Sequence, residues 1–376
     1  PEILSFQLDP KIKVGENHAI NLTWQRELPQ NMLFEVGYIG RYANKLPQST
    51  SFGQVPYMFK DLASGQTFAE AFDAVARVLR ANPNATVAPQ PWFENLVPVV
   101  NGVPGTAGAM TQAMAAALGS NFINGNINQI FLNIDRRRIV AGLQPFNNYL
   151  AQTLFLRASV GKSNYNGLFI TLRKRMSEGL LYTVNYTFSR SLDQLGAIQN
   201  AASVMPNSFD LNAEYGPSPF DITHQFNTTF LYELPFGKGK RFGVSNGALD
   251  KALGGWYVSG IYSARSGDPL TVLQGTGVWG GSLNLNFATG AIPIVDPSSF
   301  GYSVNSGVTG GTVRIGGSNV DVGTNSNPAN RGTGLNLFGK PEEVFSQFRR
   351  VNVSTDGRAG RANPLRGMSR WNMDMS

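Results

Sequence analysis

Apolar and polar side chains alternate along most regular segments of this chain, and a period of two constrains its fold more than any other feature. Successive side chains of a β-strand point to opposite faces, so such a segment has one apolar and one polar side. The first segment places Ile20, Leu22 and Trp24 on one side, and Asn21, Thr23 and Gln25 on the other. Apolar positions alternate in the same way at 32–38, 168–172, 182–188, 226–232, 256–264 and 371–375.

Three features favour a membrane barrel over a soluble β-sandwich. The apolar sides are rich in Tyr, Trp and Phe, which suit the rims of a lipid-facing barrel. The polar sides carry Asn, Gln, Thr and Ser, which suit a water-filled lumen, and short connections alternate with long ones. No apolar run approaches the roughly 18 residues that a spanning helix needs, so only a closed barrel could satisfy the backbone in lipid. The alternative is a large secreted β-domain with an aromatic core.

Long irregular stretches separate the predicted hairpins at residues 48–152, 191–222 and 267–369. In the first, Thr67 and Glu70 have the spacing of a capping box, and apolar residues from Phe68 to Leu79 follow at helical spacing. Asn82 and Pro83 should end that helix. A second, alanine-rich helix is predicted near Ala107–Leu118, ending at Gly119. The sequence therefore predicts loops that carry short helices.

Composition excludes several classes of site. The chain has no cysteine, which excludes disulfide scaffolds, zinc ribbons, iron–sulfur clusters and cysteine nucleophiles. Its two histidines are too few for a multi-histidine metal site. The net charge of +7 comes from scattered basic residues and does not predict nucleic-acid binding. The glycines at 275, 277 and 280 lack the helix that a dinucleotide site requires, and Ser245 between Gly243 and Gly247 has no later histidine for a hydrolase. We therefore expect no enzyme, no cofactor and no metal.

A few charged residues allow two interpretations each. Asp135 with the arginines at 136–138 could bind an anion, although a solvated loop is the favoured interpretation. The basic groups at 173–175 and 238–241 are expected beside periplasmic connections, where they could contact anionic groups or simply anchor and solubilise the chain. Asp193 and Asp221 flank the second long stretch and could bind a metal or hold a loop, of which a structural hydrogen bond is favoured.

A series of short strings, in this order and spacing over residues 18–376, resembles the β-barrel of TonB-dependent outer-membrane receptors. The similarity is closest to the Oar-like group, whose members carry an N-terminal carboxypeptidase-regulatory-like domain. The strings are GYIG at 37–40, SNYNGL at 163–168, YTFSRSLD at 186–193, YGPS at 215–218, FDITHQF at 220–226, ELPFGKG at 233–239, LGGWYVSG at 253–260, SGDPLTV at 266–272 and LRGMSRWNMD at 365–374.

The resemblance implies an all-β fold: an antiparallel transmembrane β-barrel, of which residues 1–376 would be one part of a barrel of about 22 strands. Residues 48–152 and 267–369 would be long extracellular loops. It implies a cell outer membrane transporter that imports an unknown small-molecule or oligomeric nutrient through a plugged lumen. Its partners would be membrane lipids, lipopolysaccharide and a TonB-type energy-coupling protein that acts through a plug missing from this chain.

Ligand contacts are expected on the polar, lumen-facing side of the strands. Two further functions remain open: a surface barrel for adhesion or assembly, and a passive porin that lacks a plug. Most lumen-facing residues of a barrel only contact water or a plug, so residues are assigned here as ligand contacts from their position alone. The candidate ligand-binding residues are Asn21, Gln25, Thr183, Asn185, Gln225, Asn227 and Thr229.

Overall fold

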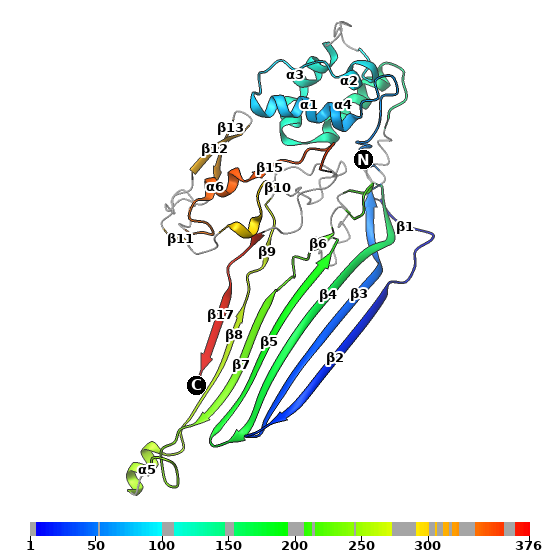
Figure 1. Cartoon of the computed structure of the whole chain (residues 1–376). Coiled ribbons are helices and arrows are strands. Elements are labelled where there is room, and N and C mark those ends of the chain that lie inside the picture. The colour runs from blue at the N-terminus through cyan, green and yellow to red at the C-terminus, as the bar shows by residue number, and fades with distance from the viewer. Residues whose placement is uncertain are drawn as a thin grey trace.

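A long, twisted antiparallel sheet carries a helical unit at one of its ends (Figure 1). In the described part of the chain, no helix is both long and apolar enough to cross a membrane. The structure is a computed structural model and describes residues 5–51, 53–99, 109–146, 154–194, 207–212, 215–243, 246–272, 291–300, 305–306, 311–315, 318–322, 335–356 and 365–376.

The predicted alternating segments form the sheet, in the order β17-β8-β7-β5-β4-β3-β2. Neighbours along this path are antiparallel and follow one another among the long strands of the chain, which is the up-and-down arrangement of barrel walls. The sheet is not closed within the described residues, because β2 and β17 form its two ends. The long strands are β2 (Glu16–Leu28), β3 (Met32–Ser51), β4 (Leu154–Ser177), β5 (Leu180–Asp193), β7 (His224–Glu233), β8 (Tyr257–Arg265) and β17 (Arg370–Met375).

Connections of different length lie at opposite ends of the sheet, as the sequence predicts. At the lower end of Figure 1, residues 29–31 join β2 to β3 and residues 178–179 join β4 to β5. A longer link, which contains α5 (Gly247–Leu253), joins β7 to β8 at the same end. Residues 52–153, 194–223 and 266–369 connect the strands at the other end.

Backbone conformation explains the tight turns. Gln30 and Asn31 have φ values of 65° and 59°, and Glu178 and Gly179 have φ values of 53° and 76°. Two consecutive residues with positive φ match the right-handed twist of the flanking strands, and Asn and Gly adopt that conformation at little cost.

Lys174 connects the two tight turns. Its side chain is 5% exposed, and its Nζ donates hydrogen bonds to the Gln30 carbonyl at 2.9 Å and to Ser177 Oγ at 2.6 Å. The basic group at 173–175 therefore contains one residue with a defined structural role, whereas Arg173 beside it is exposed.

Replacing Lys174 with Met should destabilise this end of the sheet by about 1–3 kcal/mol, because the Gln30 carbonyl loses a charged donor. Urea unfolding of the protein in lipid vesicles measures this loss. Arg173→Met is the matched control and should change the free energy of unfolding by less than about 0.5 kcal/mol. Equal effects of the two substitutions would show that the Lys174 contacts add nothing.

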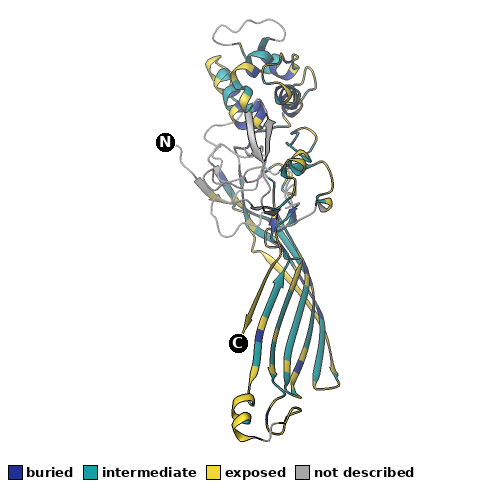
Figure 2. Ribbon diagram, turned by 90° about the vertical axis from the view of Figure 1, so that its left-hand side faces the viewer, coloured by how far each residue is buried: buried dark blue, intermediate teal, exposed yellow. Residues whose placement is uncertain are grey.

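The helical unit contains the main hydrophobic core within the described residues. Figure 2 shows buried positions concentrated in these helices, while the sheet is mostly half-buried or exposed. The capping box at Thr67 and Glu70 is present, and Phe68, Phe72, Val75 and Leu79 are buried as predicted. The helices are α1 (Phe68–Ala81), α2 (Pro91–Leu96), α3 (Ala109–Asn124) and α4 (Ile127–Val140).

The alanine-rich helix breaks at Leu118 (φ −129°), beside Gly119 where the sequence predicts its end, and a second helical stretch continues to Asn124. Two other expectations for this region are wrong. The described residues of the first loop hold four helices instead of two. Asp135 belongs to α4 and not to a solvated loop, and its fully buried carboxylate accepts a hydrogen bond from the Phe146 N–H at 2.6 Å.

Short elements complete the structure. The strand β1 (Ser5–Leu8) pairs in parallel with β4, and β6 (Gly216–Pro217) pairs with β5. The others belong to the connection between β8 and β17: β9 (Pro269–Leu270), β10 (Ile292–Pro293), η2 (Pro297–Ser299), β11 (Asn305–Ser306), β12 (Gly311–Ile315), β13 (Ser318–Val322), β14 (Leu335–Asn336), α6 (Pro341–Ser346), β15 (Phe348–Arg349) and β16 (Leu365–Arg366).

Candidate functional site

One row of polar side chains crosses the whole sheet. Cross-strand partners point to the same face, so the register can be followed from strand to strand. From Asn185 on β5, the row of cross-strand partners continues to Asn227, Ser263 and Asn372 on one side. On the other side of Asn185, the row continues to Thr171, Glu35 and Gln25. Every long strand therefore contributes an amide, hydroxyl or carboxylate at the same level.

Hydrogen bonds connect parts of this row. Gln25 Nε2 donates to Glu35 Oε2 at 2.8 Å, and Thr171 Oγ1 donates to Asn185 Oδ1 at 3.0 Å. Asn372 Nδ2 donates to Asp374 Oδ2, also at 2.8 Å, within β17. An amide carries both donors and acceptors, so these side chains can bind one another and still present groups to a ligand.

The seven predicted ligand-binding residues all lie on this face, but the structure brings only five of them together. Thr183 pairs with Thr229 and Asn185 with Asn227 across β5 and β7, and Gln225 is the next residue on this face of β7. The other two, Asn21 and Gln25, lie on β2 at the far end of the sheet path.

Phe169 is an aromatic residue on the polar face that the sequence analysis did not single out. It pairs with Gly37 across β3 and β4, and a Cβ built on Gly37 would clash with the Phe169 ring. The ring therefore covers the glycine, and any side chain at position 37 would have to displace it. Glycine inside a strand signals such a close approach.

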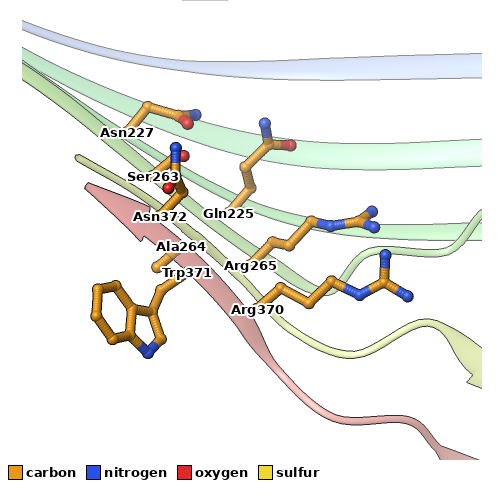
Figure 3. A pocket seen from close by; sticks show the side chains of 8 residues that line it. All are labelled: Gln225, Asn227, Ser263, Ala264, Arg265, Arg370, Trp371 and Asn372. Atoms are coloured by element: carbon orange, nitrogen blue, oxygen red, sulfur yellow. The ribbon is translucent and has the colours of Figure 1, made fainter. Parts of the chain in front are cut away.

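A pocket of about 300 Å³ lies where β7, β8 and β17 meet (Figure 3). Arg265 and Arg370 extend side by side, and Trp371 points away from them. Gln225 is the cross-strand partner of Arg265. Arg265 and Arg370 are cross-strand partners, and like charges in that position repel. Asp268 lies between them, at 3.2 Å from Arg265 Nη1 and 3.0 Å from Arg370 Nη2. The pocket thus joins neutral amides to a carboxylate-bridged arginine pair.

The candidate set missed four polar residues of this pocket: Ser263, Arg265, Arg370 and Asn372. Alternation alone identifies Ser263 as polar-sided, but it does not show which strands are neighbours. The pairing of β8 with β17 joins residues more than a hundred positions apart in the chain, and no local pattern encodes it.

The opposite face is aromatic at the corresponding place. A pocket of about 400 Å³ there includes Tyr186, His224, Phe226, Tyr262 and Trp371. Tyr186 Oη and His224 Nδ1 are 2.7 Å apart, and the two rings stack with centroids 6.2 Å apart. The two faces of the sheet therefore differ in chemistry over the same strands, as the alternation predicts.

Asp221 holds loops together, which confirms the favoured interpretation of this residue. It is 1% exposed, its Oδ1 accepts the Ser191 N–H at 2.6 Å, and its Oδ2 forms an ion pair with Arg366. Arg366 also donates to the Asp221 carbonyl at 2.6 Å. This contact ties the connection after β5 to the segment that precedes β17.

The remaining sequence candidates concern a metal site, a hydrolase and a dinucleotide site. Among the described residues, no group of three or more histidine or acidic side chains could hold a metal ion. Ser245 and the glycines at 275, 277 and 280 lie outside the described residues.

One family of sequences, described as the outer membrane beta barrel domain, matches residues 2–376 of this chain. No curated protein and no solved structure matches it. The family match covers both the sheet and the helical unit.

Proposed function

Because this chain belongs to the outer membrane beta barrel domain family and is an outer-membrane protein, we propose that it forms part of the wall of a TonB-dependent transporter. In this proposal the polar face lines the lumen and the aromatic face contacts lipid. The long connections lie outside the cell, where they first meet the nutrient. A periplasmic energy-coupling protein acts through a plug, and no chemical conversion takes place.

The polar row is the observation that carries this proposal. A wall in contact with a passing solute needs groups that both donate and accept hydrogen bonds without binding too tightly. Neutral amides and hydroxyls at Thr171, Asn185, Asn227, Ser263 and Asn372 have this property.

A surface barrel used for adhesion or assembly is the second candidate. The observation that favours it is the helical unit, which has its own buried aromatic core and stands at the end of the sheet that carries the long connections. A passive porin remains the third candidate, because a polar wall alone also suits free diffusion.

Uptake from a defined mixture distinguishes these candidates. Cells with the native gene should deplete at least one class of small molecules or oligomers from the mixture, and an uncoupler of the membrane potential should stop depletion. The double substitution Asn185→Leu/Asn227→Leu should slow it at least tenfold, by removing paired amides from the wall. Mass spectrometry of the medium measures the rates, and Val184→Leu on the other face is the control.

Depletion that continues in the presence of the uncoupler would support a porin. The same protein, extracted from the outer membrane, would then pass a steady potassium chloride current in a planar bilayer. Unchanged depletion in the double variant would remove these amides from the transport path. Equal depletion with and without the gene would favour the adhesion or assembly role.

A further inference from the structure

Residues 349–356 form a compact segment, here called the hook, that reaches the helical unit from the connection between β8 and β17 (Figure 1). Arg349 forms a bidentate ion pair with Asp356, with both N–O distances at 2.7 Å, and the Asn352 N–H also donates to Asp356 at 2.7 Å. Val351 and Val353 point into the helical core and are 0% and 1% exposed. The hook is therefore both closed on itself and inserted into the helices.

Asp73 of α1 fixes the hook in place. Its Oδ1 accepts the Val353 N–H at 2.9 Å, and its Oδ2 accepts the Ser354 N–H at 2.7 Å and the Ser354 hydroxyl at 2.6 Å. Burial raises the pKa of Asp73, and these hydrogen bonds lower it only in part. Both oxygens of this carboxylate are thus committed to the hook.

Two further arginines meet at the same junction. Arg80 lies two turns after Asp73 on α1, and its Nε donates to the Ile123 carbonyl at 3.1 Å, which fixes its guanidinium against α3. Arg350 comes from the hook. Burial and the charge of Arg350 lower the pKa of Arg80 to about 10, and burial also lowers the pKa of Arg350. The two arginines thus approach the junction from its two sides, α1 and the hook, which the Asp73 hydrogen bonds hold together.

The charges at this junction do not balance. Asp356 accepts hydrogen bonds from Arg349 and from the backbone N–H of Asn352. Asp73 accepts hydrogen bonds from two backbone N–H groups of the hook and from the Ser354 hydroxyl. One Arg80 nitrogen, Nη2, and one Arg350 nitrogen, Nη1, are buried without a hydrogen-bond partner. Buried guanidinium groups are normally paired, because an unpaired buried donor loses its interactions with water. Among the described residues named here, three arginines stand against two carboxylates, and only Arg349 forms an ion pair with one of them, which leaves one positive charge in excess.

We propose that Arg80 and Arg350 together bind a small oxyanion, a carboxylate or a phosphate group, at the junction of α1 and the hook. Such a group carries at least two acceptor oxygens and matches the planar donor fork of arginine. One negative charge would neutralise the excess. The anion would also tie the hook to α1 beside the Asp73 contact.

This site lies in the helical unit and is separate from the polar face of the sheet, so it does not depend on the transport proposal. It differs from the arginine pair at Arg265 and Arg370, because Asp268 already bridges that pair. It also differs from Arg349, whose carboxylate partner is present in the hook.

Calorimetric titration of the detergent-extracted protein with sodium phosphate tests the proposal, with sodium acetate as a second arm and sodium chloride as the control for ionic strength. We expect saturable binding of phosphate, acetate or both, and the stronger arm identifies the chemical class. Arg350→Met should weaken that binding at least tenfold. Arg77→Met, which removes an exposed arginine from the same helix, should leave it unchanged.

A second variant separates binding from folding. Arg350→Lys keeps the charge but removes the planar fork, so it should bind weakly while the helical unit keeps its resistance to protease. A titration with no saturable signal in either arm would overturn the proposal. So would binding that survives Arg350→Met in a protein whose helical unit remains protease-resistant.

Discussion

Ile170→Arg should destabilise the protein in lipid vesicles by about 2–4 kcal/mol, the cost of an arginine on the lipid face near the bilayer centre. Ile170 lies on the aromatic face of β4, between Val36 and Tyr186 in the cross-strand row. None of these neighbours offers a charge partner. A urea titration in vesicles measures the shift in unfolding free energy.

Thr171→Arg is the matched control, one residue further along the same strand. Thr171 faces the polar side between Glu35 and Asn185, so an arginine there meets water and acceptor groups. We expect its cost to stay under about 1 kcal/mol, as for other exposed substitutions. If Thr171→Arg were the more damaging of the two, the faces would have been assigned the wrong way round.

Phe68→Ala should unfold the helical unit while the sheet stays folded. Phe68 is fully buried, and its ring centroid lies 5.0 Å from those of both Trp92 and Phe131. Truncation of a buried phenylalanine costs about 3–5 kcal/mol, through lost burial and the cavity left behind. Within the described residues, the core that contains Phe68 includes no residue of the long strands.

Limited proteolysis measures the helical unit, and the heat-dependent gel mobility of the protein measures the sheet. Faster cleavage between α1 and α4 is expected with unchanged gel mobility. Leu62→Ala is the control, since this leucine is 94% exposed and its removal should change neither readout. Loss of both signals together in Phe68→Ala would show that the helices and the sheet fold as one unit.

The strands and their faces could be predicted because their signal is local. A period of two in side-chain polarity identifies a strand and its two sides without knowledge of its neighbours. The hairpin that turns at 29–31 and the strand that begins at His224 follow the prediction closely. The capping box at Thr67 is local in the same way, and its helix is present.

The missed features depend on contacts between distant parts of the chain. The core of the helical unit includes Val351 and Val353, and the Asp73–Val353 hydrogen bond joins residues 280 positions apart. Asp135 appeared solvated in the sequence because three arginines follow it, but the helix turns it inward to the Phe146 N–H. The pocket residues Arg370 and Asn372 became visible only through the pairing of β17 with β8.

The most direct test of the central claim places one spin label at a time along β5. The chain contains no cysteine, so single substitutions such as Val184→Cys and Asn185→Cys introduce unique labelling sites. In vesicles, the label at 184 should collide mainly with oxygen dissolved in lipid, and the label at 185 mainly with a water-soluble nickel complex. Continued alternation at Tyr186 and Thr187 would establish the sheet as a membrane wall with a polar lumen face. Equal access of the nickel complex to all four positions would contradict the account.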